Sequence, residues 1–485
     1  MNSAKWLSLV AYFKRQTRRE FMNLSNDPML PKLKWALEEI KAQNEEKFYA
    51  WKITIQHYQS LQTLMVGDVG SEFEQYQNRD VLDHSYQIDI YTRHSDPIVM
   101  GNSSFTIDPL ANLAQQVKKT YNNSLLVSNK PWDLPEKLNG EFDQVLTTDP
   151  VIGENITKAH GKLLRDINEK IKTVTEVKAN SAELFTNLKS TFFETSMGLS
   201  GQKQNSDIYF EMAVEKLPTP NTQEVLKYKK AISIEDADLA RFIDEVVEET
   251  LSISETIVPK TCDDSTIMVD GEVISNLLND IVLQLNASRE YDKSPFFTKG
   301  DSILSQEKSS DSDYINITLD PTVPVMALTT PFTAEGMKPI KAEIIKDDVV
   351  LTQMVGNRIG QYLGVEPNYI SGNMLVNIGT KTKEELLDSV DECIEIIAFS
   401  SLLINANTLT WSSEIKLGKL YRKGKFATML KGGVVSGSIK ENLANFKFSN
   451  EVIKVNEVAG GFHAACGYVG PNHMLIKSGV KVVGE

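Results

Sequence analysis

Apolar residues recur at helical spacing in four segments of the first half of the chain. In residues 31–47, Leu33, Leu37 and Ile40 fall on one face, which predicts an amphipathic helix. The same spacing predicts three further helices, over residues 108–119 with Asp108 as the cap, 154–172 and 235–252.

Strand patterns lie between these helices. Residues 86–91 alternate apolar and polar side chains, as a half-buried strand does. Two strands are predicted over residues 49–57 and 61–66, separated by a short polar turn. A further pair is predicted within residues 181–216, with its turn around residues 201–204.

After residue 260 the pattern becomes irregular and then rich in strands. The Ser- and Asp-rich residues 300–313 are expected to form a mobile loop. Because helices and strands mix without a regular βαβ rhythm, the expected fold class is α+β, with a mixed helix and strand N-terminal domain and a β-rich C-terminal domain. The predicted elements here are strands at 265–269, 314–318, 341–345 and from Ile394 onward, and helices at 272–286, 354–363 and 383–390.

Length and charge exclude several classes of protein. A chain of 485 residues is long enough for two or three domains, and no apolar run approaches the ~20 residues of a spanning helix. The net charge of −14 opposes phosphate binding by the molecule as a whole. Cys262, Cys393 and Cys466 are far apart, which favours a reducing compartment over a disulfide framework. We therefore expect a cytoplasmic protein without a membrane or nucleic-acid partner.

The first 30 residues are expected to form an extension. Residues 1–19 carry five basic residues and no acid, among apolar side chains. A membrane-surface helix, an organelle presequence and a twin-arginine export signal all have this character. The export signal is disfavoured because the polar residues 23–28 stand where its apolar region belongs. We favour a helix docked on the body, or upstream sequence with the true start at Met22.

Most catalytic motifs are absent from the sequence. None of the six histidines is followed by Glu, and no two lie closer than ten residues, so the zinc-peptidase motifs HExxH and HExxxH are missing. Phosphate-binding loops and the GxSxG nucleophile motif are missing too.

One local cluster contains potential metal ligands. His463, Cys466 and His473 offer two imidazoles and a thiol, a set that binds soft metals or pairs a nucleophile with a base. A structural zinc site needs a fourth ligand from elsewhere. We therefore favour a buried cysteine with two ordinary histidines, and keep these three residues as weak catalytic candidates.

A basic stretch over residues 411–440 raises the alternative of DNA binding. It holds seven Lys or Arg against one acid, and Trp411 and Tyr421 offer stacking surfaces. However, its charges alternate with apolar residues, which is typical of a solvated strand face.

The C-terminal half contains several motifs that are similar to those of the TldD/PmbA family and occur in the same order. This family was historically named modulator of DNA gyrase. Residues 331–336 and 344–350 resemble the family's F-D-x-E-G stretch and the I-x-x-G-V-L turn that follows it. Thr333, Ala334 and the pair Asp347 and Asp348 depart from that pattern. The resemblance covers roughly residues 250–485, and the first 250 residues diverge. It continues at residues 363–364, 371–373, 382–387, 411–418, 465–467 and 474–484.

The family resemblance implies a subunit role. One branch, TldD-like, carries HExxxH on a helix and adds a C-terminal cysteine as a zinc ligand; the other, TldE- or PmbA-like, lacks these histidines and pairs with the first. Here the metal helix should fall near residues 272–282, which contain no histidine, although Cys466 stands at the matching cysteine. The chain then resembles the non-zinc subunit.

The implied activity is that of a heteromeric TldD/TldE metallopeptidase acting on unfolded peptides in an enclosed cleft. This chain would hold no cofactor, and zinc would sit on a TldD-like partner. Two alternatives remain: a homo-oligomeric peptide-binding protein without peptidase activity, and a stand-alone peptidase using Cys466. The expected domains are an extension over 1–30, an α+β domain over 31–250 and a β-rich TldD/PmbA domain over 251–485.

Overall fold

The computed structural model describes residues 23–95, 98–136, 142–218, 224–253, 256–457 and 466–485. The basic segment 1–19 and His463 lie outside these residues. Within them, no helix is long and apolar enough to cross a membrane.

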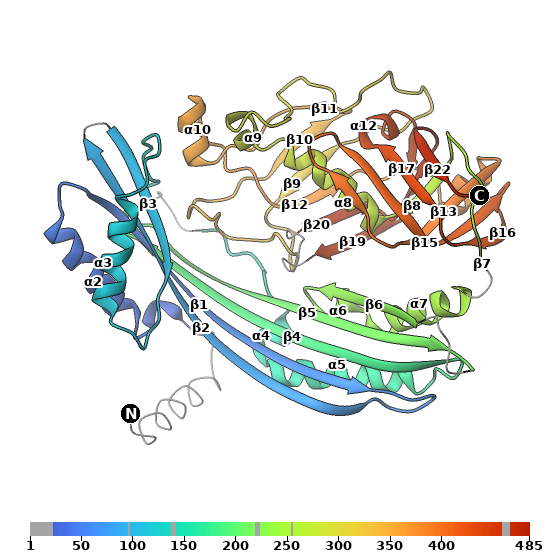
Figure 1. Ribbon diagram of the computed structural model, residues 1–485, viewed down its shortest axis with the longest axis horizontal. Helices are drawn as coiled ribbons and strands as arrows, with labels where there is room; N and C mark the ends of the chain where they lie inside the picture. The colour runs from blue at the N-terminus through green and yellow to red at the C-terminus, as the bar shows by residue number, and fades with distance from the viewer. Residues whose placement is uncertain (1–22, 96–97, 137–141, 219–223, 254–255, 458–465) are drawn as a thin grey trace.

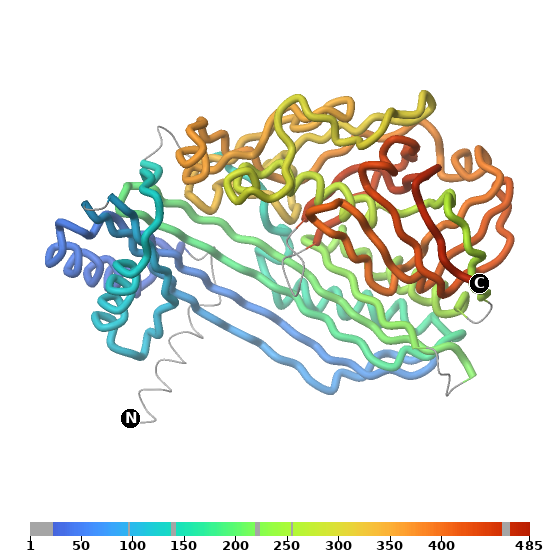
Figure 2. The backbone as a smooth tube through the Cα atoms, turned by 45° about the horizontal axis from the view of Figure 1, so that its top comes forward, coloured from blue at the N-terminus to red at the C-terminus, as the bar shows by residue number. Residues whose placement is uncertain are grey.

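The first half of the chain is built on one antiparallel sheet of long strands, in the order β3-β2-β1-β4-β5-β6. Figure 1 shows this sheet running beneath the C-terminal part, and Figure 2 shows the same arrangement from a second direction. The strands are β1 (Phe48–Val66), β2 (Glu74–Ser95), β3 (Ile98–Thr106), β4 (Val177–Thr195), β5 (Ser200–Lys216) and β6 (Glu224–Ala231).

Two predicted turns in this sheet are wrong. Residues 58–60 do not separate two strands, because they pair with β2 on one side and β4 on the other, so β1 is continuous. Because strand side chains alternate, Tyr58 and Ser60 face one side of the sheet and Gln59 the other, so the polar run does not mark a turn. The turn between β4 and β5 lies at residues 196–199, closed by the Thr195 amide donating to the Leu199 carbonyl at 2.8 Å.

Helices cover the apolar face of the sheet. Ile208, Phe210 and Met212 of β5 join residues of α5 and α7 in one buried core. Because strand side chains alternate, the odd-numbered β5 residues, Lys203 among them, occupy the opposite, polar face. The helices are α2 (Leu30–Gln43), α3 (Leu113–Ser124), α4 (Pro150–Glu154), α5 (Ile156–Ile171), α6 (Ile234–Ala237) and α7 (Leu239–Ser252), preceded by the short 3-10 helix η1 (Leu24–Asn26).

Local chemistry sets the ends of these helices. Asn112, not Asp108, caps α3, its side chain accepting from the Gln115 amide at 3.0 Å. The single helix predicted over 235–252 is divided into α6 and α7 at Asp238, whose φ of 35° is left-handed.

The C-terminal half contains two sheets. One has the order β11-β10-β9-β12-β20-β19 and the other β18-β21-β8-β13-β15-β16-β7, with β14, β17 and β22 attached. The strands are β7 (Thr256–Ile257), β8 (Ile267–Asp270), β9 (Ile317–Asp320), β10 (Ala342–Lys346), β11 (Val349–Val350), β12 (Asn373–Val376), β13 (Glu392–Phe399), β14 (Leu403–Asn405), β15 (Thr410–Arg422), β16 (Lys425–Leu430), β17 (Val434–Ser438), β18 (Phe446–Phe448), β19 (Val452–Glu457), β20 (Cys466–Pro471), β21 (His473–Ile476) and β22 (Val480–Val483).

The helix α8 is central to this half. Its buried residues Ile274, Leu278 and Ile281 share one core with strands of both sheets. The expected α+β class is therefore confirmed. The helices are α8 (Gly271–Leu283), α9 (Ala287–Tyr291), α10 (Asn357–Leu363), α11 (Lys383–Asp388) and α12 (Ile439–Asn442).

Candidate functional site

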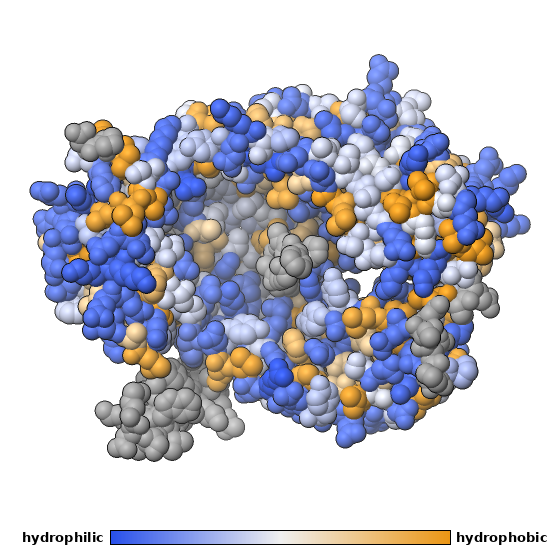
Figure 3. All heavy atoms as spheres, in the orientation of Figure 1, coloured by the Kyte–Doolittle hydropathy of each residue, from blue (hydrophilic) through white to orange (hydrophobic). Residues whose placement is uncertain are grey.

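A cleft separates the polar face of the N-terminal sheet from the C-terminal half, and Figure 3 shows this side of the molecule hollowed between them. Three lysines of the sheet reach across it. Lys52 Nζ donates to the Ala334 carbonyl at 2.6 Å, and Lys203 Nζ donates to Thr330 Oγ1 at 3.0 Å. The third, Lys230, pairs with Glu457 at 2.9 Å.

Two cavities adjoin within the cleft, sharing Ala334, Glu335 and Gly356 in their walls. The first, about 320 Å³, is lined by Trp51, Tyr91, Trp132 and other residues. The second, about 470 Å³, is lined by Lys203, Phe332 and several hydroxyl side chains. Cavities of this size accept peptide side chains or termini.

The strand β19 offers an open edge beside these cavities. It pairs with β20 on one side, and within the described residues no strand pairs with its other side. Asn456 of β19 accepts from the Ala327 amide at 3.0 Å, and Ala327 lines the larger cavity. An open edge can bind an extended peptide through backbone hydrogen bonds.

The helix α8 and Cys466 meet at this cleft, although 190 residues separate Ser275 from Cys466. The buried Cys466 thiol lies within hydrogen-bonding reach of the Ser275 side chain. Burial raises the pKa of Cys466 to about 11, with Glu457 adding to the shift and Ser275 opposing it. A thiol in this environment stays protonated at neutral pH and is a poor nucleophile.

Glu272, in the first turn of α8, is a candidate that the sequence interpretation missed. Solvent reaches its side chain, although protein atoms surround most of it. Burial raises the pKa of its carboxyl, and the Asp270 and Glu457 carboxylates raise it further. A carboxyl with such a pKa suits proton transfer. One Glu among 65 acidic residues gives no sequence signal.

His473 has its own partners. Its Nδ1 lies 3.1 Å from Glu451 Oε2, and its amide donates to Ser449 Oγ at 3.1 Å. Cys466 and His473 therefore contact different side chains, while His463 lies outside the described residues. Among the residues that are described, no three His, Cys, Asp or Glu side chains are grouped to hold a metal ion.

A second polar cluster, also missed, lies on the N-terminal sheet. His57 and His84 are directly opposite each other on β1 and β2, with ring centroids 4.0 Å apart. His57 Nε2 lies 2.9 Å from Asp27 Oδ2. Their separation of 27 residues concealed the pairing, which depends on strand register.

The basic stretch 411–440 lies mostly on β15 and β16. Trp411 is buried, and its Nε1 donates to Asn442 at 2.8 Å, so its ring offers no stacking surface. Three of its cations pair with carboxylates: Lys416 with Glu249, Lys419 with Glu248 and Arg422 with Glu392.

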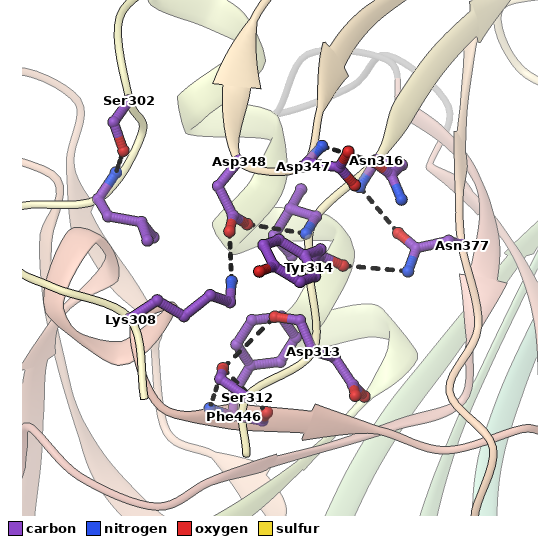
Figure 4. Close-up of polar contacts among 12 residues, drawn as sticks. Ser302, Lys308, Ser312, Asp313, Tyr314, Asn316, Asp347, Asp348, Asn377 and Phe446 are labelled. Atoms are coloured by element: carbon purple, nitrogen blue, oxygen red, sulfur yellow. Dashed lines mark hydrogen bonds and ion pairs between the residues drawn. The ribbon is translucent and has the colours of Figure 1, made fainter. Parts of the chain in front are cut away.

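The two aspartates that depart from the family pattern form the turn between β10 and β11. Asp347 and Asp348 have φ values of 49° and 65°, a conformation that Asp adopts more readily than most residues. The buried Asp348 carboxylate accepts from the Ile315 amide at 2.8 Å and pairs with Lys308; Figure 4 shows these contacts. These contacts anchor residues 300–313, for which the sequence predicted a mobile loop.

Comparisons with known proteins agree with this architecture. The model of the PmbA/TldA metallopeptidase C-terminal domain matches residues 263–478. No curated protein matches the sequence.

Three solved structures share the fold. A proposed modulator of DNA gyrase from Bacteroides thetaiotaomicron has a TM-score of 0.74 at 15% identity, covering 94% of this chain and 99% of its own. TldE from Thermococcus kodakarensis has a TM-score of 0.72 at 13% identity, covering 93% and 100%. A proposed gyrase modulator from Thermotoga maritima has a TM-score of 0.70 at 15% identity, also covering 93% and 100%.

At these identities the structures establish a common fold and no more. The family model makes residues 263–478 similar to the PmbA/TldA metallopeptidase C-terminal domain.

Proposed function

We propose that this chain is the TldE/PmbA-like, non-zinc subunit of a heteromeric TldD/TldE metallopeptidase that degrades or processes unfolded peptides. The observation that carries the proposal is the position of α8. The family resemblance places the zinc helix here, and α8 lies in the cleft beside Cys466, yet its thirteen residues contain no histidine.

The side chains around α8 do not suit a catalytic zinc ion. Such sites use three protein ligands, mostly His with Glu, Asp or Cys. Among the described residues, Asp270 instead caps the helix, accepting from the Val273 amide at 2.9 Å, and no three His, Cys, Asp or Glu side chains are grouped to hold a metal ion. We therefore assign the zinc and the hydrolytic step to a TldD-like partner.

The contribution of this chain is then to bind and enclose the substrate. The open edge of β19 would hydrogen-bond the backbone of an extended peptide, which gives affinity with little dependence on sequence. The polar face of the N-terminal sheet would form the opposite wall and limit access to unfolded segments.

Reconstitution tests this assignment. The chain is purified alone and together with an HExxxH-bearing relative from the same genome, and zinc content and hydrolysis of a casein-like substrate are measured. We expect zinc and hydrolysis only in the mixture, and both should disappear when the partner's HExxxH histidines are replaced.

Two results would contradict the proposal. Hydrolysis by the isolated chain that disappears in Cys466→Ser would favour the stand-alone peptidase. A zinc-free homo-oligomer that binds unfolded peptide and never associates with the relative would favour the peptide-binding protein.

A further inference from the structure

Lys203 is the only cation in the wall of the larger cavity, among the residues described there. It reaches this position from β5, with its Nζ 3.0 Å from Thr330 Oγ1 and 5.4 Å from the centre of the Phe332 ring. Burial lowers the pKa of Lys203 to about 8, and the charge of Lys189 adds to the shift.

No carboxylate of the described residues forms an ion pair with Lys203. Asp207, on the same strand, and Glu335, in the cavity wall, have other partners. Asp207 accepts from Asn187 at 2.6 Å and faces Lys189, while Glu335 accepts from the Asn357 amide at 2.8 Å. Lys230, in the same cleft, has Glu457 as its partner. A half-buried cation without a counter-ion is unfavourable, so a counter-ion supplied by a ligand would explain it.

The cavity's chemistry indicates the charge of that ligand. Apart from Lys203, its walls contain hydroxyls, the Asn286 amide, backbone and apolar groups, with Glu335 turned toward α10. One ammonium matches a singly charged anion. A carboxylate fits this description, whereas phosphate sites usually gather several cations or backbone amides.

The cavity lies next to β19. Ala327 lines it and is hydrogen-bonded to Asn456 of β19. A peptide extended along β19 would therefore place its end, or one of its side chains, at the cavity. We propose that Lys203 binds a carboxylate of the peptide substrate, either its C-terminus or an Asp or Glu side chain. This inference rests on the proposed function.

Three unfolded peptides of one sequence test the proposal on the full chain. The first has a free C-terminal carboxylate, the second a C-terminal amide, and the third a C-terminal amide with one internal Glu. Binding is measured by fluorescence anisotropy. We expect at least one carboxylate-bearing peptide to bind about tenfold more tightly than the peptide with only a C-terminal amide, a difference of about 1.4 kcal/mol. Tighter binding of the first peptide would identify the C-terminus as the carboxylate, and tighter binding of the third would identify the Glu side chain.

Two substitutions assign the effect to Lys203. In Lys203→Met and Lys203→Gln, the tenfold preference should disappear while affinity for the amidated peptide is kept. Lys338→Met is the matched control, because Lys338 is exposed and pairs with Asp143; it should retain the preference. Lysine-directed labelling followed by mass spectrometry should show protection of Lys203 by the preferred peptide only.

The outcomes separate the two proposals. Equal binding of all three peptides, or a preference that survives both Lys203 substitutions, overturns the carboxylate site and leaves peptide binding intact. Failure of every peptide to bind overturns both the site and the proposed function.

Discussion

Lys308 and Lys203 are two partly buried lysines that have different partners. Lys308 pairs with Asp348, with only 13% and 4% of the two side chains exposed, and its ammonium also lies over the Tyr314 ring at 4.6 Å. Within the part of the chain that the structure describes, Lys203 contacts a hydroxyl and a phenyl ring and forms no ion pair with an acid. The first lysine fastens a loop onto the C-terminal core, and the second faces a cavity. The difference in partners predicts opposite effects on stability when each lysine is replaced.

The largest expected effect is at Lys308. Lys308→Met leaves the Asp348 carboxylate buried without its cation, and losing one partner of a buried pair costs about 3–5 kcal/mol. We expect that loss in the free energy of unfolding, measured by urea denaturation, together with faster proteolysis in residues 300–313.

A double variant sharpens this prediction. In Lys308→Met with Asp348→Asn, no buried charge remains unpaired, and Asn tolerates the left-handed turn conformation. The double variant should recover much of the lost stability. Equal destabilisation in the single and double variants would show that the ion pair is not the cause.

Lys203→Met should act in the opposite direction. The pKa of Lys203 falls from its ordinary 10.5 to about 8, so between these values the unfolded chain binds more protons than the folded chain. Folded stability therefore rises with pH through this window, and the full cost of the buried charge is present at pH 7. We expect Lys203→Met to be more stable by about 1–3 kcal/mol at pH 7.

The pH dependence distinguishes relief of a buried charge from improved packing as the cause of the stabilisation in Lys203→Met. The stabilisation should shrink as the pH rises from 8 toward 10.5, because folded wild-type Lys203 loses its proton through this range and above 10.5 is neutral in both states. A gain that stays constant across that range in urea denaturation would argue against relief of a buried charge.

The smallest effect is expected at an exposed pair. Lys338 Nζ lies 2.9 Å from Asp143 Oδ2, with 46% and 53% of the side chains exposed. Solvent screens such pairs, so Lys338→Ala should change the free energy of unfolding by less than about 0.5 kcal/mol. A change comparable to that of Lys308→Met would remove the distinction between the two environments.

The sequence predicted local structure well where periodicity was long and uninterrupted. The helix over Ile156–Ile171 was expected within two residues, because a single apolar face specifies both the helix and its buried side. It was wrong where tertiary pairing overrode local polarity. Residues 58–60 look like a turn, yet strands on both sides satisfy their backbone groups.

By itself the sequence determined the α+β class, the similarity to a metallopeptidase family and the lack of histidines on the helix that became α8. Only the tertiary structure decided that Cys466 lies against Ser275, that His57 faces His84, and that Lys203 lines a cavity beside Thr330 and Phe332. The physical reason is the distance along the chain over which each interaction acts. Side-chain periodicity records neighbours a few residues away, whereas burial and pairing of charge depend on strand register and on how the two halves of the chain enclose the cleft.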